Sequence, residues 1–311
     1  MVFMLPRENP THVRPSICTD VRVDFPSLRD RPCEYPDARP NEQRWPYVYM
    51  NSRIYPLELN FTAPVHLMNV SVRTENGSKI LSAWLRSHGL VPIEKRLPVL
   101  ACGSNAYPRQ LADKFLRFPV ADDSILTLPS RIHGIRIVYA ASFSVTNGYI
   151  PVTPQHVPDG EAETWIQWLS PEQIEAISET EGRGYRLVEL TGVDLVIPGL
   201  RESPTRIYAW WHDSFLDLGA GAIDHRSQEL STASTMTEAD VLHDTVGLFI
   251  QMHGLETDGA SLTWDGCVVP TSLREPLRDF IAEHGYVNPI ARTWSVIDRS
   301  KSHFADNLLP T

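Results

Sequence analysis

The sequence predicts an α+β fold, with strands in the middle of the chain and helices in its last third. Strand candidates outnumber helix candidates between residues 96 and 215. Two amphipathic helices dominate residues 216–311, whereas ten of the 25 prolines precede residue 65, where no helical period survives. We therefore expect a core over residues 96–215, a Pro-rich arm with a lead-in helix over residues 1–95, and a helical extension over residues 216–311.

The Pro-rich arm carries enough apolar surface to pack onto the core rather than to extend freely into solvent. The side chains that indicate this are Phe25, Trp45, Tyr47, Tyr49, Ile54 and Tyr55. A helix is expected over residues 78–89, with Ser78 as its N-cap and Gly89 as its terminator. This helix leads directly into the first strand of the core.

An apolar run ends abruptly at a small polar turn near residue 100. Residues 97–105 read as a buried strand that ends in Gly103-Ser104-Asn105, and a helix is expected to begin near Pro108. A turn between a strand end and a helix start exposes several backbone N–H groups. Such a cluster favours an anionic ligand.

A short helix with clear terminal signals is predicted over residues 170–182. Ser170 and Gln173 form a capping box, and Gly182 is expected to close the last turn in the left-handed conformation. Glu181 follows Ile177 by four residues, so its carboxylate shares the inward apolar face. It is then partly desolvated and suited to proton transfer, although a solvated residue at a frayed helix end is the alternative.

The remaining elements follow from the same patterns. Two prolines argue against a central strand over residues 149–154. The strand candidates are residues 131–140, 163–169, 185–196 and 206–211. One helix is expected over residues 237–253, capped by Thr237 and burying Leu242, Val246, Phe249 and Met252. A second helix is expected over residues 272–284, capped by Ser272 and ended by Gly285.

Composition excludes several classes of partner. A net charge of −10 argues against binding to nucleic acid or to an anionic membrane, because both need a surplus of Lys and Arg. No apolar run is long enough to cross a bilayer, and residues 1–6 are too short for a signal peptide, so we expect a cytoplasmic protein. We expect a small-molecule partner, no nucleic acid, no membrane, and possible homo-oligomers.

Other chemistries find little support in the sequence. The four cysteines, Cys18, Cys33, Cys102 and Cys267, are too scattered for a zinc site, so free thiols and no metal are expected. His212 and Asp213 point to opposite faces of a strand. Cys102 with His133 remains as a nucleophile and base pair, against the alternative of a cysteine that only packs.

The strand-turn and the later Glu-Gly pair together resemble the gamma-glutamylcyclotransferase-like family. That family reads Tyr-Gly-Ser-Asn where this chain has Cys102-Gly103-Ser104-Asn105, and it has a catalytic glutamate where this chain has Glu181-Gly182. Tyr185 also resembles a commonly matched tyrosine. The resemblance covers residues 96–212, with two departures: cysteine replaces the tyrosine, and Ile177-Ser178 replaces a common Leu-Asp.

The resemblance implies a small mixed β-barrel with flanking helices. It also implies a cofactor-independent reaction in which a γ-glutamyl amide or peptide cyclises, releasing 5-oxoproline and a free amine. Glu181 would be the catalytic residue. The substrate-binding residues would be Val99, Leu100, Ala101, Cys102, Gly103, Ser104, Asn105 and Tyr185. Two alternatives use the same barrel: a non-catalytic binding or scaffold protein, and a biosynthetic enzyme that removes a γ-glutamyl protecting group.

Overall fold

The computed structural model describes residues 21–22, 45–182, 184–217, 224–225, 235–236, 238–253, 269, 271–299, 305 and 308–309. The α-helices are α1 Leu81–Ser87, α2 Pro108–Arg117, α3 Pro171–Thr180, α4 Glu238–His253 and α5 Thr271–Glu283. The strands are β1 Val21–Arg22, β2 Tyr47–Met50, β3 Arg53–Glu58, β4 Ser71–Thr74, β5 Gly77–Ile80, β6 Leu97–Ala101, β7 Ile125–Tyr139, β8 Val152–Leu169, β9 Tyr185–Leu190, β10 Asp194–Val196, β11 Ile207–His212, β12 Ser214–Leu216, β13 Asp224–His225, β14 Thr235–Met236, β15 Gly285–Val287 and β16 Ser295–Val296.

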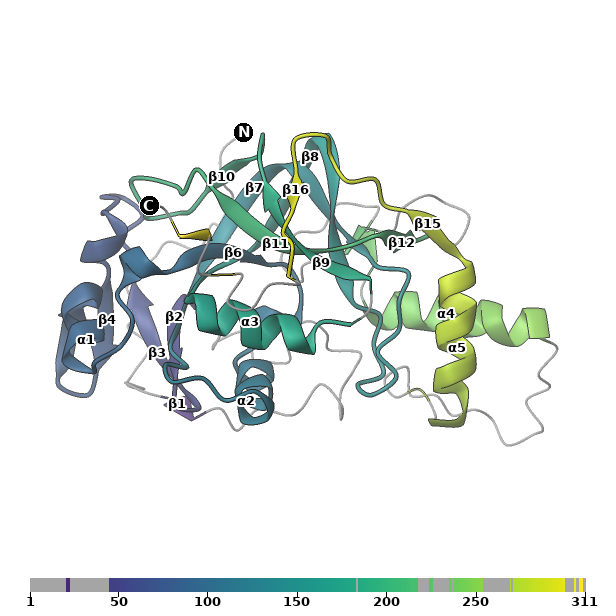
Figure 1. Cartoon of the computed structure of the whole chain (residues 1–311), viewed down its shortest axis with the longest axis horizontal. Coiled ribbons are helices and arrows are strands. Elements are labelled where there is room, and N and C mark those ends of the chain that lie inside the picture. Colours follow the sequence, from purple (N-terminus) through teal and green to yellow (C-terminus); the bar gives the residue numbers. More distant parts are fainter. Residues whose placement is uncertain are drawn as a thin grey trace.

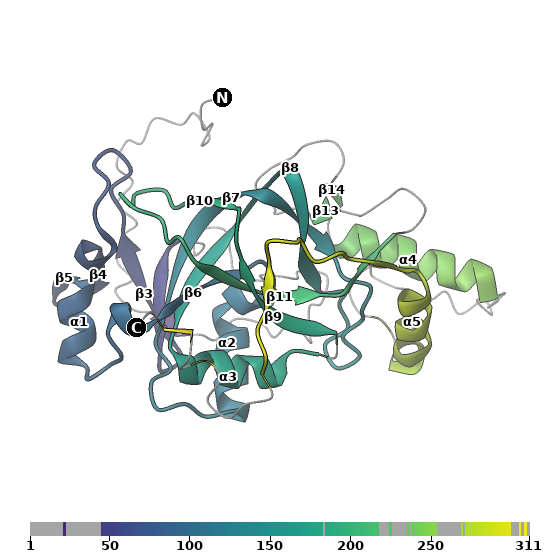
Figure 2. The ribbon, with the colours of Figure 1, turned by 45° about the horizontal axis from the view of Figure 1, so that its top comes forward.

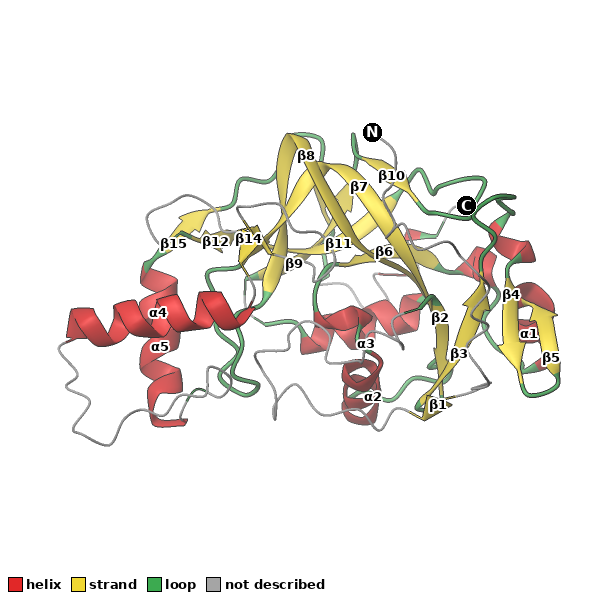
Figure 3. Ribbon diagram, turned by 180° about the vertical axis from the view of Figure 1, so that it is seen from behind, coloured by secondary structure: helices red, strands yellow, loops and turns green. Residues whose placement is uncertain are grey.

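The α+β fold with flanking helices is confirmed. A large mixed sheet runs in the order β16-β9-β11-β6-β8-β7-β2-β3-β4-β5. It curls strongly, while α2 and α3 cover one side, α1 lies at one end and α4 and α5 lie at the other (Figures 1 and 3). The first and last strands of this order do not pair with each other in the described part of the chain, so the sheet is curled rather than closed into the expected barrel.

The curl originates in the long β7–β8 hairpin, whose two strands arch over the sheet (Figure 2). The register between them shifts between His133 and Ile135, where Gly134 has a φ of 89°. A Cβ at Gly160 would lie 2.7 Å from the carbonyl oxygen of Ile135, so the backbones approach closely there. A bulge of this kind bends a strand and increases its twist. The first part of β7 then pairs with β2, and a later part pairs with β10.

The second half of the Pro-rich arm belongs to the sheet. Tyr47, Tyr49 and Ile54 are at most 1% exposed, and β2 pairs with β7. Their burial agrees with the prediction that the arm packs onto the body, while Phe25 lies outside the described residues. The division of the chain at residues 95 and 215 stays a proposal.

The expected helix over residues 78–89 is wrong at its start. Ser78 lies in β5, which pairs with β4 across a turn where Gly77 has a φ of 98°. This hairpin draws the residues before Leu81 into the sheet, so α1 begins only after Ile80. Gly89 does end the helix, with a φ of 67°.

The prediction against a central strand over residues 149–154 agrees with the described pairings, although its second half does lie in a strand. Val152 begins β8, and Pro154 pairs with Ile137 of β7. Among the described pairings, β6 joins the other side of β8 only from Trp165 onward. Pro154 therefore lies in a part of β8 that needs ladder bonds on one side only, where proline is tolerated.

Both C-terminal helices form close to their expected limits, although Thr237 lies outside the described residues. Phe249 of α4 contacts Phe280 of α5 edge to face at 5.5 Å between ring centroids. Met252 is 60% exposed, contrary to expectation, because α4 extends past α5 (Figure 1). In the part of the chain that the structure describes, no helix has both the length and the apolarity that a bilayer crossing requires.

Candidate functional site

The turn after β6 forms as predicted, and side chains of two other strands hold it in place. β6 lies between β11, to which it is parallel, and β8. After it, residues 104–106 make one 3₁₀ turn before α2 begins at Pro108. Gln167 of β8 donates a hydrogen bond to the carbonyl oxygen of Asn105 at 2.9 Å, and Tyr47 of β2 donates to that of Ala106 at 2.6 Å. Buried side chains from two other strands therefore fix the turn.

The turn keeps backbone donors available. The amides of Ala106 and Tyr107 bond within it, to the carbonyl oxygens of Gly103 and Ser104. No described residue accepts a hydrogen bond from the amides of Gly103, Ser104 or Asn105. Unused amides at the start of a helix attract negative charge or a polarised carbonyl oxygen, as the sequence predicts.

The capping box predicted at the start of α3 is confirmed. The Gln173 amide donates to Ser170 Oγ at 3.3 Å, and the Ser170 amide donates to Gln173 Oε1 at 2.8 Å. Gln173 Nε2 also donates to the carbonyl oxygens of Asp122 and Ser124, at 2.7 and 2.8 Å. Together with the buried Ile177, these contacts fix the start and inner face of α3, and hence the place where the chain leaves it.

The end of this helix differs from the prediction at Gly182. Glu181 is the C-cap residue, in an extended conformation with φ −73° and ψ 134°. Gly182 does not adopt a positive φ, whereas Gly184 has a φ of 96°. A Cβ at Gly184 would lie 2.5 Å from Nε2 of His212. The chain turns two residues later than expected, at a position where the His212 ring leaves no room for a side chain and glycine is required.

Glu181 lies in a buried ion pair rather than in an apolar recess. Its Oε1 accepts from Lys114 Nζ at 2.9 Å and from Asn105 Nδ2 at 3.2 Å. The Lys114 ammonium also donates to Asn105 Oδ1 at 2.7 Å. The two charged side chains are only 8% and 13% exposed. Because no described group donates to Oε2, that oxygen remains available to a ligand.

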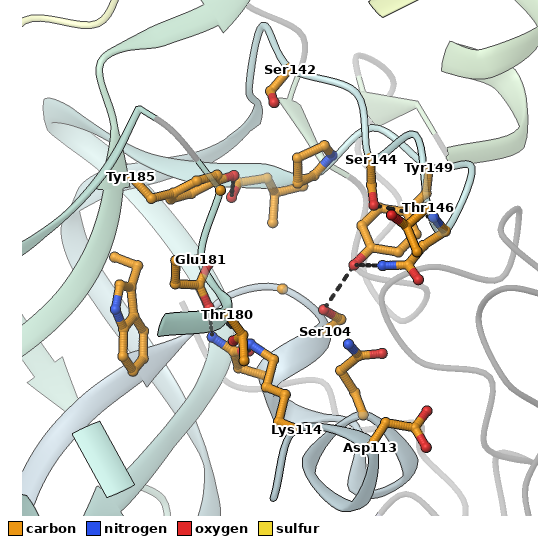
Figure 4. A pocket seen from close by; sticks show the side chains of 18 of the residues that line it. Ser104, Asp113, Lys114, Ser142, Ser144, Thr146, Tyr149, Thr180, Glu181 and Tyr185 are labelled. Atoms are coloured by element: carbon orange, nitrogen blue, oxygen red, sulfur yellow. Dashed lines mark hydrogen bonds and ion pairs between the residues drawn. The ribbon is translucent and has the colours of Figure 1, made fainter. Parts of the chain in front are cut away.

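A cavity of about 790 Å³ joins Glu181 to the turn. Glu181 and Lys114 lie on one side of it, and Ser104 and Tyr149 lie on the other (Figure 4). Of the residues predicted from the sequence, the cavity is lined by Leu100, Cys102, Gly103, Ser104, Asn105, Glu181 and Tyr185. Val99 and Ala101 are buried in β6 and do not line it. A volume of this size suits a ligand larger than a single amino acid.

Cys102 lines the cavity but is poorly suited to act as a nucleophile. Burial raises the pKa of its thiol to about 12, which opposes formation of a thiolate. His133, the base considered for it, is 44% exposed at its side chain, pairs with Glu161 at 3.4 Å and does not line the cavity. The structure therefore does not assemble the Cys102–His133 pair.

Tyr185 is a fixed wall of the cavity. Its hydroxyl donates to the carbonyl oxygen of Val152 at 2.9 Å, and its ring meets His212 edge to face at 4.8 Å between ring centroids. Burial first, and the charge of Glu181 second, raise its pKa well above the usual value of 10. His212 is itself buried, and its Nδ1 lies 2.9 Å from the carbonyl oxygen of Ser214. It is a buried histidine at the end of β11 with a main-chain partner for one ring nitrogen.

Sequence reasoning missed Lys114 and Tyr149. Lys114 follows the buried Leu111 by three residues and precedes the buried Phe115, so a cation on the apolar face of a helix was its readable signal. Tyr149 reaches the turn from the β7–β8 connection, where its hydroxyl lies 3.4 Å from Ser104 Oγ. Among the described residues, no three His, Cys, Asp or Glu side chains gather to hold a metal ion.

No family model and no curated protein matches the chain. In fold it is similar to a solved structure titled gamma-glutamyl cyclotransferase, with 13% identity and a TM-score of 0.32 over 69% of this chain and 98% of that one. An uncharacterized protein from Homo sapiens gives 14% identity and a TM-score of 0.32, with the same coverage. A protein from Arabidopsis thaliana, whose structure was solved in solution, gives 13% identity and a TM-score of 0.28 over 51% of this chain and 89% of that one.

Proposed function

We propose that this protein is a cyclotransferase that acts on a γ-glutamyl amide or peptide and releases 5-oxoproline and a free amine. One observation carries the proposal: a buried carboxylate, Glu181, lines the same cavity as the Gly103–Ser104 turn with its unused amides. A proton acceptor and a cluster of main-chain donors thus line one cavity. This is the combination that acyl transfer requires.

The reaction balances without a cofactor. The α-amine nitrogen of the substrate attacks its own γ-carbonyl carbon, a carbon–nitrogen bond forms in a five-membered ring, and the bond to the leaving amine breaks. The α-ammonium loses two protons in becoming the lactam N–H: Glu181 Oε2 would take one and return it to the leaving nitrogen, and the other ends on the released amine, which departs as an ammonium. Since nucleophile and carbonyl belong to one molecule, the protein mainly has to hold the reactive conformer. The turn amides would bind the glutamyl carboxylate or the carbonyl oxygen.

The ion pair with Lys114 favours a second candidate, a binding protein that retains the cavity without the reaction. A carboxylate that already accepts from an ammonium at 2.9 Å has one oxygen occupied by a cation instead of open to a substrate proton. In this alternative the Lys114–Glu181–Asn105 cluster recognises a polar ligand and transfers no proton. A small-molecule γ-glutamyl partner, the absence of a nucleic-acid or membrane partner, a homo-oligomeric state and a cytoplasmic location also stay proposals.

The test is direct detection of 5-oxoproline. Purified protein is incubated with γ-glutamyl dipeptides, glutathione and γ-glutamyl amines, and products are measured by mass spectrometry. Glu181→Gln keeps the size and the hydrogen-bond acceptor but removes the base, so kcat should fall about 10²- to 10⁴-fold. Glu179→Gln is the matched control, because Glu179 lies on the exposed face of α3 and does not line the cavity. Full turnover by Glu181→Gln removes Glu181 from the mechanism; binding of these compounds without turnover in the unmodified protein supports the binding-protein candidate.

A further inference from the structure

The wall of the cavity opposite Glu181 is a short segment between β7 and β8. Ser142, Ser144, Thr146 and Tyr149 point from it toward the cavity (Figure 4). The segment folds on itself, since the amides of Asn147 and Gly148 both donate to the carbonyl oxygen of Ser144, at 3.1 and 2.6 Å. We call residues 142–149 the outer wall.

Helix α5 of the C-terminal extension holds the middle of the outer wall. The Arg274 guanidinium donates through one nitrogen to the carbonyl oxygens of Val145 and Thr146, at 2.9 and 3.3 Å. Its Nε donates to the carbonyl oxygen of Val269 at 2.9 Å. A single side chain thus joins the outer wall to the chain that precedes α5, through hydrogen bonds to a charged donor.

The other end of α5 approaches the start of the outer wall. A Cβ at Gly285 would lie 2.7 Å from the Cβ of Ala141, so the Gly285 backbone packs directly against the Ala141 side chain. β15, which begins at Gly285, pairs with β12, and the carbonyl oxygen of Ser214 in β12 accepts from the Ala141 amide at 3.3 Å. Contacts from both ends of α5 therefore reach the outer wall, at its middle and just before its start.

We infer that Arg274 is a positioning residue that fixes the outer wall, and that α5 thereby decides which leaving amines the cavity accepts. This inference rests on the proposed function. With the glutamyl part at Glu181 and Gly103, the remainder of a substrate extends toward the side of the cavity that carries Ser144 and Thr146 (Figure 4). The shape of that side affects binding of the leaving amine and leaves the proton transfer at Glu181 unchanged.

The first measurement needs no activity. Amide hydrogen exchange of the outer wall should speed up about tenfold in Arg274→Ala, because the wall loses its hydrogen bonds to a charged donor. Arg278→Ala is the matched control. Arg278 lies one turn further along α5 and pairs with Glu275 and Asp279 instead of the wall, so its removal should change exchange less than about twofold. Gly285→Ala, which displaces α5 from Ala141, should reproduce the effect with Arg274 intact. The variant Arg274→Lys keeps a charged donor, so its outer wall should exchange at a rate between those of the unmodified protein and Arg274→Ala.

The second measurement is steady-state kinetics with two substrates. For a γ-glutamyl dipeptide, Arg274→Ala should raise KM about tenfold with kcat within about twofold, whereas γ-glutamyl methylamide, whose leaving amine is too small to reach the wall, should show almost no change. Equal exchange of the outer wall in Arg274→Ala and Arg278→Ala overturns the inference, as does an equal change in KM for both substrates. Lack of any turnover by the unmodified protein refutes the proposed function instead, and the exchange experiment then still decides the role of Arg274 in holding the wall.

Discussion

Replacing Lys114 by methionine should destabilise this protein, and replacing Glu181 at the same time should restore part of the loss. Lys114→Met keeps the length of the side chain but leaves the Glu181 carboxylate in a site where it is only 13% exposed. A buried charge that loses its partner is far costlier than a buried pair. The second substitution should therefore raise the free energy of unfolding, whereas an additional mutation ordinarily lowers it.

The magnitude follows from the geometry of the pair. Breaking a buried ion pair by removing one partner costs about 3–5 kcal/mol. Here Asn105 Nδ2 still donates to Oε1 at 3.2 Å, and the carboxylate borders an open cavity, so we expect the lower end, about 3 kcal/mol. In the double variant Lys114→Met/Glu181→Gln no uncompensated charge remains. Its free energy of unfolding should be only about 2 kcal/mol below that of the unmodified protein, so it should be more stable than Lys114→Met alone.

Urea unfolding followed by tryptophan fluorescence measures these free energies, because the chain has eight tryptophans, including Trp210 on the cavity wall. Arg109 and Asp113 provide the matched control on the same helix. They pair at 3.2 Å but are 39% and 38% exposed, so Arg109→Met should cost less than about 1 kcal/mol and couple weakly to Asp113→Asn.

Additive effects would refute this reasoning. If the double variant is less stable than Lys114→Met, with the two losses adding within about 0.5 kcal/mol, the two groups do not interact in solution. Glu181 would then not be held by Lys114, and the picture of a carboxylate with one occupied and one available oxygen would be wrong.

Two further predictions concern residues beside Glu181. Because burial raises the pKa of Cys102 to about 12, only about one thiol in 10⁴ is ionised at pH 8, and the thiolate fraction grows tenfold with each pH unit above that. Iodoacetamide should leave Cys102 unmodified in folded protein at pH 8 and modify it in urea, as peptide mass spectrometry will show; rapid labelling of the folded protein contradicts the burial. Gly184→Ala should lower stability by about 2 kcal/mol, because the residue has a φ of 96° and a Cβ would meet His212, whereas a Cβ at Gly182 has no atom within 4 Å. Thermal unfolding compares the two variants, and equal melting temperatures would show that the turn does not require glycine at position 184.

Much of the fold near the site was readable from local sequence. The buried strand before the Gly103–Ser104 turn, the start of α2 at Pro108 and the capping box of Ser170 and Gln173 all form as predicted. Each depends on residues within about four positions of one another, where hydrogen bonding and side-chain periodicity act directly. The same local rules placed Ser78 in a helix, and that prediction failed because pairing of β5 with β4 outweighed the capping preference.

The ion pair at the centre of the site was not readable in this way. Lys114 and Glu181 are 67 residues apart in the chain, and they meet because α2 and α3 lie on the same side of the sheet (Figure 1). Tyr149 reaches Ser104 across 45 residues, and Arg274 reaches Val145 across 129. No local pattern encodes such separations, since they depend on how the strands between them are ordered.

The sequence by itself determined the chemical groups of the site and their local settings: a carboxylate after a capped helix, and a Gly-Ser-Asn turn after a buried strand. Tertiary structure alone decided that a lysine occupies one oxygen of that carboxylate, that Gly184 rather than Gly182 makes the turn, and that α5 supports the far wall of the cavity. The physical reason is the separation along the chain over which each kind of interaction acts. Backbone conformation responds to neighbours along the chain, whereas burial, ion pairing and cavity shape depend on residues that only the packed fold brings together.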